Sequence, residues 1–408
     1  MSRYRWTILA VGVGAQTAFS ALRQGLPSLG PALQSHFHLG LTQIGLVLAS
    51  VNVGIVLTLL AWGVLADRRG ERPVLALGLG GCAAALVGAA AAPTYGWLLL
   101  TLALAGASGS AAIGGSGRAV MNWFSRAERG LALGIRQTGV PLGGGVAAIS
   151  LPLLASALGL RGALLALAIG AAVASLASAR WMRDAPERPV PAAAPPAPPP
   201  LRDRRLWRLA AGSSLIVVAQ SGMFGFLVIY LHRERGWAPT AAAAALAALY
   251  VGGALARILS GRWSDRLEER VAPVRRLVAL SSLLILAAVG LAAAGAPTAA
   301  LLPALLLGGV LAASWNALSF TAAAELSGRR RAGTAIGVQN TLLNAGAALA
   351  PVWFAAVVTA TSWELGWSLL AVSQLAGVAI LGPLVAEERA RRAARHRRTQ
   401  TVHARLPA

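Results

Sequence analysis

The sequence predicts an all-α polytopic membrane protein with twelve transmembrane helices in two pseudo-symmetric six-helix bundles. Three observations support this fold class. The 408 residues are 56% hydrophobic, which is more than a soluble domain can bury. Apolar runs of about 20 residues, long enough to cross a bilayer, recur along the chain. Similar charged turns also occur 198 residues apart, around Asp67 and Asp265.

The first half of the chain contains six apolar runs bounded by charge, Pro or Gly. The predicted spans cover residues 6–27, 41–66, 73–92, 96–119, 129–158 and 161–181. After Trp181 the chain becomes polar and then runs through five prolines between residues 195 and 200, which cannot continue a helix. We therefore expect an N-terminal bundle over residues 1–182 and a cytoplasmic Pro/Arg-rich linker over residues 183–206.

The second half repeats this arrangement. Its predicted spans cover residues 207–231, 240–262, 274–295, 298–324, 332–360 and 364–386. They form the C-terminal bundle, 207–386, and a basic cytoplasmic tail follows at 387–408. Most Arg residues fall in alternate loops and in the two ends of the chain, a bias that marks the cytoplasmic side. We expect both termini in the cytoplasm, in a multi-pass protein of the cell (inner) membrane.

A second pair of stretches supports an internal duplication. Residues 129–138 align with residues 332–341 and share Gly, Ala, Gly and Thr at matching positions. Their offset of 203 residues is close to the 198 residues between Asp67 and Asp265. Duplicated halves related by an axis along the membrane normal are typical of secondary transporters that hold a site at mid-bilayer.

The charged turn between the second and third spans carries a family resemblance. It reads Gly-x-x-x-Asp-Arg-x-Gly-x-Arg from Gly63 to Arg72, and Gly261 to Arg266 is a weaker copy. The pattern resembles the signature loop of the major facilitator superfamily (MFS) of secondary transporters.

The resemblance implies a latch that closes an inner gate. Asp67 is expected to face the start of the eleventh span near Gly333, and by symmetry Asp265 the start of the fifth near Gly130. The expected gating residues are Gly63, Asp67, Arg68, Gly70, Arg72, Gly261, Asp265 and Arg266. The alternative is that these residues are solvated turn charges that only fix the topology.

Arginines inside apolar spans are the strongest pointers to a site. A guanidinium at mid-bilayer costs roughly 2.5–3.5 kcal/mol on insertion scales and stays charged, so it needs water, a carboxylate or a bound anion. Arg136 and Arg257 lie deepest, whereas Arg23 and Arg118 are predicted near span ends, where they can snorkel. The sequence places no Asp or Glu in the middle of a predicted span. We therefore expect a small anionic substrate, with bonding to backbone carbonyls or to a loop carboxylate as the alternative.

The segment from Arg257 to Asp265 resembles the eighth span of MFS branches that carry nitrate, oxalate and cyanate. The resemblance implies that Arg257 binds substrate. Neutral polar side chains near mid-span are further candidates to line the site, or else to bond between helices. They are Gln16, Asn52, Gln137, Gln220, Tyr250, Asn316, Gln339, Asn340 and Asn344. The duplication places Gln339 opposite Arg136, on the matching helix of the other half.

Other functional classes fit the sequence poorly. The predicted spans hold no Asp pair, Ser–His dyad or metal-binding cluster, so an enzyme, a metal site and a cofactor are not expected. The net charge of +22 would suggest nucleic acid in a soluble protein, but the Arg residues lie in loops beside lipid. We expect a monomer whose partners are the bilayer and a small solute. A drug or metabolite efflux antiporter is the alternative, because the residues from Gly139 to Gly144 resemble part of a drug-exporter motif.

Overall fold

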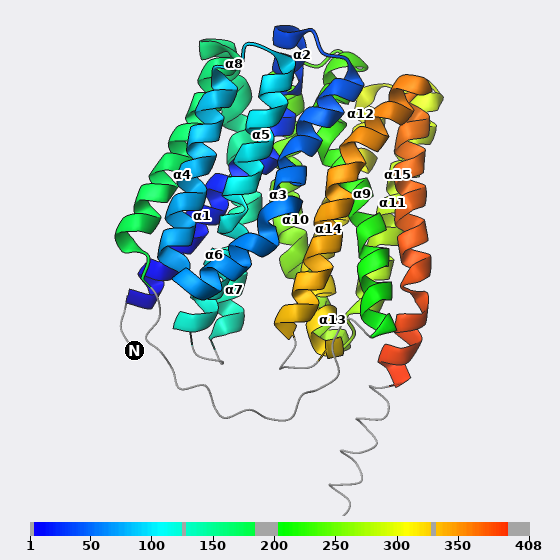
Figure 1. Cartoon of the computed structure of the whole chain (residues 1–408). Helices are drawn as coiled ribbons and strands as arrows, with labels where there is room; N and C mark the ends of the chain where they lie inside the picture. The colour runs from blue at the N-terminus through cyan, green and yellow to red at the C-terminus, as the bar shows by residue number, and fades with distance from the viewer. Residues whose placement is uncertain (1–3, 125–127, 184–202, 328–331, 391–408) are drawn as a thin grey trace, which may run out of the picture. The chain divides into compact units, whose positions relative to one another are not determined.

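The computed structural model describes residues 4–124, 128–183, 203–327 and 332–390, and within these ranges the regular structure is helical throughout. Most of the expected linker and tail, residues 184–202 and 391–408, lies outside the described residues. Figure 1 labels the helices and colours the chain from blue at the N-terminus to red at the C-terminus. Those of the first half are α1 (Tyr4–Gly25), the 3-10 helix η1 (Leu26–Leu29), α2 (Gly30–Phe37), α3 (Leu41–Arg69), α4 (Glu71–Ala90), α5 (Tyr95–Gly109), α6 (Ala111–Trp123), α7 (Arg129–Gln137) and α8 (Gly139–Trp181). Those of the second half are α9 (Arg204–Arg233), α10 (Pro239–Leu267), α11 (Val271–Ala293), α12 (Thr298–Ser314), α13 (Asn316–Ser327), α14 (Ala332–Ala360) and α15 (Trp363–Ile380).

These helices account for the twelve predicted spans. Ten helical stretches in the described part of the chain are long and apolar enough to cross a membrane. One of them, Gly134–Trp181, contains two spans, because the chain turns at Gly159, where φ is +70°. Only a residue without a Cβ adopts this backbone conformation readily. The more polar α1 is the remaining span, and the prediction of an all-α polytopic fold is confirmed.

The first span is longer than predicted. Helical structure continues from Tyr4 to Phe37 through α1, η1 and α2, and only residues 38–40 separate it from α3. The expected end at residue 27 is wrong because Pro27 and Pro31 occupy the first turns of η1 and α2. At these positions the missing N–H of Pro leaves no helical hydrogen bond unmade.

The described residues pack into two compact units that do not follow the two halves of the sequence. One unit combines Met1–Pro195 with Ser221–Gly252 and Ala347–Gly366, and the other contains the remaining segments. Within the first unit, helix ends from the two halves meet beside the turn at residues 38–40. The hydroxyls of Thr42 and Thr359 lie 3.3 Å apart, and the indole of Trp363 donates a 2.8 Å hydrogen bond to Glu234. Polar side chains from the two halves of the sequence therefore contact each other at this end of the first unit.

Glycines allow the backbones of α3 and α5 to approach closely. A Cβ at Gly54 would overlap the backbone oxygen of Ala103, and a Cβ at Gly106 would overlap the backbone of Val51. Small residues at such crossings are typical of membrane helices, where lipid offers no hydrophobic drive for association. The contact therefore depends on both glycines.

We predict that Gly54→Ala and Gly106→Ala each lower the free energy of unfolding by about 1–3 kcal/mol, because the atoms they would meet belong to the backbone. Thermal unfolding in detergent measures this effect. Gly170→Ala is the matched control, since a Cβ there meets nothing within 4 Å. Equal melting temperatures for all three variants would contradict the prediction.

Candidate functional site

The guanidinium of Arg136 is buried among neutral oxygen atoms. It lies in α7 and is only 9% exposed. Its Nη1 donates to Gln16 Oε1 of α1 at 3.0 Å and to Ser116 Oγ of α6 at 2.9 Å, and Nη2 donates to Gln137 Oε1 at 3.4 Å. Its Nε is buried and finds no hydrogen-bond partner among the described residues. Among the described residues, the positive charge of Arg136 is solvated by amide and hydroxyl groups and is not paired with a carboxylate.

The second half repeats this polar cluster without the charge. Gln339 of α14 donates from Nε2 to Ser213 Oγ of α9 at 3.0 Å and to Ser319 Oγ of α13 at 2.5 Å. Ser319 follows Ser116 by 203 residues, and Gln339 likewise follows Arg136 by 203. The Oε1 atom of Gln339 is buried and unpartnered in the described structure. The duplication is therefore visible in side-chain contacts as well as in the sequence.

Two spans are each interrupted near their middle by a helix break, and backbone carbonyls beside each break accept hydrogen bonds from side chains. The fourth span is interrupted between α5 and α6 at Ser110, and the tenth between α12 and α13 at Trp315. In the fourth span, Thr58 Oγ1 and Trp62 Nε1 of α3 both donate to the carbonyl of Ala107 at 2.7 Å. These side chains satisfy a carbonyl beside the break.

Arg257 has the equivalent role in the second half. Its Nε donates to the carbonyl of Ala313 at 2.7 Å, and Ser260 Oγ donates to the carbonyl of Ser314 at 3.1 Å. Arg257 follows Thr58 by 199 residues in the sequence. Part of its guanidinium therefore supports the break in the tenth span, which is the backbone-carbonyl alternative considered above.

The other predicted polar residues lie in separate contacts. Asn52 Oδ1 accepts a 2.9 Å hydrogen bond from Arg23 Nε, and Tyr250 donates from its hydroxyl to the carbonyl of Gln24 at 2.8 Å. In the second unit, Gln220 accepts from Asn316 at 3.3 Å, and Asn344 donates to the carbonyl of Asn340 at 2.8 Å. Their roles in substrate binding stay predictions.

Four residues of these clusters were not singled out from the sequence as site residues: Arg23, Ser116, Ser213 and Ser319. The duplication offset could have indicated Ser116 and Ser319, because two hydroxyls recur 203 residues apart. Arg23 was expected to snorkel from a span end. The structure places it inside a longer helical run, in contact with Asn52 of α3.

The first charged turn is built on a glycine that the motif requires. Gly70 joins α3 to α4 with φ +83°, a conformation that favours Gly. Arg72 of α4 donates from Nε to the carbonyl of Ala179 in α8 at 2.8 Å, and Arg68 is exposed. The side chain of Asp67 lies outside the described structure, so its proposed latch stays a prediction.

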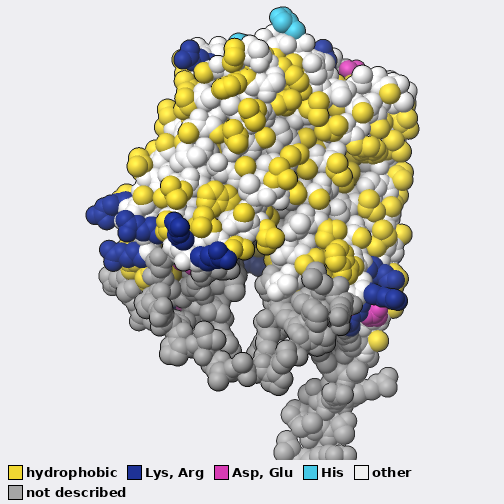
Figure 2. Space-filling model, in the orientation of Figure 1, with side chains coloured by type: hydrophobic (Ala, Val, Ile, Leu, Met, Phe, Trp, Pro, Cys, Tyr) yellow, Lys and Arg dark blue, Asp and Glu magenta, His cyan; other side chains and the backbone are white. Residues whose placement is uncertain are grey.

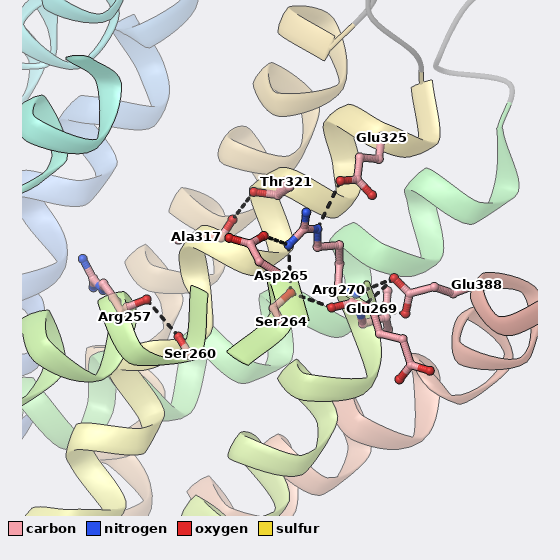
Figure 3. Close-up of polar contacts among 11 residues, drawn as sticks. Arg257, Ser260, Ser264, Asp265, Glu269, Arg270, Ala317, Thr321, Glu325 and Glu388 are labelled. Carbon is pink, nitrogen blue, oxygen red and sulfur yellow. Dashed lines mark hydrogen bonds and ion pairs between the residues drawn. The ribbon is translucent and has the colours of Figure 1, made fainter. Parts of the chain in front are cut away.

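The second charged turn centres on Arg270, between α10 and α11 (Figure 3). Its guanidinium pairs with Asp265 at 2.5 Å and with Glu325 of α13 at 3.1 Å. The backbone N–H groups of Arg270 and Val271 donate to Glu388, which caps the start of α11. Burial acts to lower the pKa of Arg270, but the hydrogen bonds to the two carboxylates outweigh it and raise the pKa. Asp265 is thus paired within its own unit, while Arg266 is exposed and Gly261 lies in the last turns of α10.

We predict that Arg270→Gln lowers the free energy of unfolding by about 1 kcal/mol, because it removes two ion pairs whose carboxylates are largely exposed. The difference from wild type should shrink in high salt, which screens exposed charges. Denaturation at two salt concentrations measures both effects. Arg262→Gln, an exposed position in the same segment, is the control, and equal stability of the two variants would contradict the prediction.

Comparison with known proteins agrees with this architecture. Residues 12–351 match the sequence pattern of the Major Facilitator Superfamily. The chain is 34% identical to an uncharacterized MFS-type transporter of Mycobacterium tuberculosis, over 98% of this chain and 91% of the relative. It is also 28% identical to a hexuronate transporter of Bacillus subtilis, over 30% of this chain and 29% of the relative.

Solved structures show the same fold. A bacterial homolog of the human lysosomal transporter Spinster, in an inward-facing and occupied conformation, matches with a TM-score of 0.76 at 16% identity, over 95% of this chain and 97% of that chain. A mutant of the nucleoside transporter NupG matches with a TM-score of 0.73 at 17% identity, over 92% of this chain and 99% of that chain. The chain belongs to the major facilitator superfamily and has the all-α fold of its membrane transporters.

Proposed function

We propose that this transporter moves a small organic or inorganic anion across the cell membrane by alternating access. The observation that carries the proposal is the environment of Arg136. A buried guanidinium that cannot be deprotonated requires compensation, and its partners in the described structure are neutral. An anionic solute supplies the missing negative charge.

The comparison of the two halves supports a specific role for this charge. Arg136 and Gln339 occupy equivalent positions, and each bonds to a Ser that the duplication also repeats. At the equivalent position of the second half, the neutral amide of Gln339 packs against the repeated Ser. A structural role alone therefore does not require a guanidinium at this position, and its charge points to a ligand.

The resemblance to relatives supports the same class of substrate. One partial relative is a hexuronate transporter, and a hexuronate carries a carboxylate that is ionised at neutral pH. The similarity of the eighth span to nitrate, oxalate and cyanate carriers points in the same direction. We retain Arg257 as a substrate contact, in addition to its bond to Ala313.

We further propose that both termini face the cytoplasm in the inner membrane and that the protein acts as a monomer. Exposed arginines near the turn between α3 and α4, namely Arg68, Arg69 and Arg72, support this orientation. On the face drawn in Figure 2, Arg side chains gather towards one end and apolar side chains cover the stretch beyond them. By this orientation, the end of the first unit that contains Thr42 and Thr359 faces the exterior.

Arg136→Gln is predicted to reduce kcat/KM for anion uptake at least about tenfold, because it removes a charge that contacts the solute. Uptake of labelled nitrate, oxalate, glucuronate and cationic drugs into liposomes measures this. Arg161→Gln, an exposed position in α8, is the control. Normal anion uptake by Arg136→Gln would refute the anion site, and transport of drugs alone would favour efflux.

A cross-link between positions 42 and 359, on the proposed exterior side, tests alternating access. In a Cys82→Ala background, which removes the single Cys of the chain, Thr42→Cys and Thr359→Cys should form a disulfide under oxidation. Uptake should stop and then recover after reduction, because this side must open in each cycle. Each single Cys variant should be insensitive to oxidant. Undiminished uptake by the cross-linked protein would contradict the proposed cycle.

A further inference from the structure

Arg23 lies far from both ends of its helical run. The run from Tyr4 to Phe37 places 19 residues before Arg23 and 14 after it. At the rise of an α-helix these correspond to about 28 Å and about 21 Å. An arginine side chain cannot reach either end of this run over such distances.

The contacts of Arg23 leave one edge of the guanidinium available. Its Nε donates to Asn52 Oδ1 at 2.9 Å, and Asn52 Nδ2 donates to the carbonyl of Leu48 at 3.1 Å, which orients the amide. Nη1 and Nη2 have no hydrogen-bond or ion-pair partner in the described part of the chain. Neither atom is sealed from the surface, in contrast to Nε of Arg136. The edge of the Arg23 guanidinium that carries Nη1 and Nη2 is therefore open to a ligand.

The surroundings of Arg23 suit a small polar ligand. Tyr250 of α10 reaches the helix beside Arg23, because its hydroxyl donates to the carbonyl of the next residue, Gln24, at 2.8 Å. The ring of Tyr250 meets Phe224 edge to face, with centroids 5.2 Å apart. On the α8 side, the backbone of Gly144 approaches the same ring. An aromatic wall beside a guanidinium excludes water and strengthens a bond to an anion.

Arg23 lies on the same face of α1 as Gln16, a hydrogen-bond partner of Arg136. Gln16, which accepts from Arg136, is seven residues before Arg23 in α1. Seven residues are two helical turns, so both side chains project from one face of α1, with levels about 10 Å apart. At an offset of 197 residues the second half has Gln220, a neutral amide, at the position of Arg23. Both positive charges thus belong to the first half.

We propose that Arg23 is a second anion-binding residue on the solute path, with Asn52 orienting it and Tyr250 lining it. Its Nη1 and Nη2 atoms bind two oxygens of a planar oxyanion group, such as a carboxylate or nitrate, through two parallel hydrogen bonds in a bidentate, end-on arrangement. This inference rests on the proposed function, because it names a further contact for the same class of solute. The proposed path then holds two cationic residues, Arg136 of α7 and Arg23 of α1.

Charge rescue at this position tests the proposal. In the Cys82→Ala background, Arg23→Cys is reconstituted in liposomes, and uptake of labelled nitrate, oxalate and glucuronate is measured. The KM of the anion carried by the background protein should rise about tenfold or more. Attachment of an ethylammonium group to the thiol through a methanethiosulfonate should restore uptake, whereas the ethylsulfonate and neutral methyl reagents should not.

The controls separate a binding role from a structural one. Arg23→Lys, which keeps the charge on a flexible stem, should retain more uptake than Arg23→Gln at equal amounts of folded protein, as judged by gel filtration. The inference is overturned if Arg23→Cys transports normally, if its thiol does not react, or if all reagents act alike. Uptake that depends on Arg136 but not on Arg23 overturns this inference alone. Absence of uptake of all three anions by the wild type overturns the proposed function as well.

Discussion

The organisation of this transporter depends on the compensation of permanent positive charge inside the membrane. A guanidinium stays protonated in a protein, so burial cannot neutralise it and each one must be solvated by fixed groups or by a ligand. Gln16 and Ser116 partly provide this for Arg136, and Asn52 does so for Arg23. In both cases one or more nitrogen atoms remain without a partner in the described structure. This incomplete solvation distinguishes a binding site from ordinary packing.

The duplication shows which features are structural and which are specialised. Hydroxyl groups recur at Ser116 and Ser319, and in both halves a helix break is supported by side chains from the span two before it. These shared contacts maintain packing in either half. The central side chain differs, since Arg136 in one half is replaced by Gln339 in the other. Selection of an anion is therefore proposed to reside in the first half, while the second contributes neutral groups and Arg257.

Much of the fold was predictable from the sequence, because apolar length and charged turns report directly on spans and loops. The end of the first span was not, since Pro27 and Pro31 occur where helices tolerate proline, and Arg23 was consequently predicted near the end of a span and not inside a longer helical run. The bond from Arg257 to Ala313 was also hidden, because the break at Trp315 has no Gly or Pro beside it. Side-chain pairing across helices depends on rotation and tilt, which periodicity alone does not determine.

An experimental structure with the transported anion bound would test the central claim most directly. The account predicts an oxygen atom of the anion within hydrogen-bond distance of the guanidinium of Arg136, with its contacts to Gln16 and Ser116 loosened or shared. An anion held elsewhere, with Arg136 keeping its neutral partners unchanged, would contradict it.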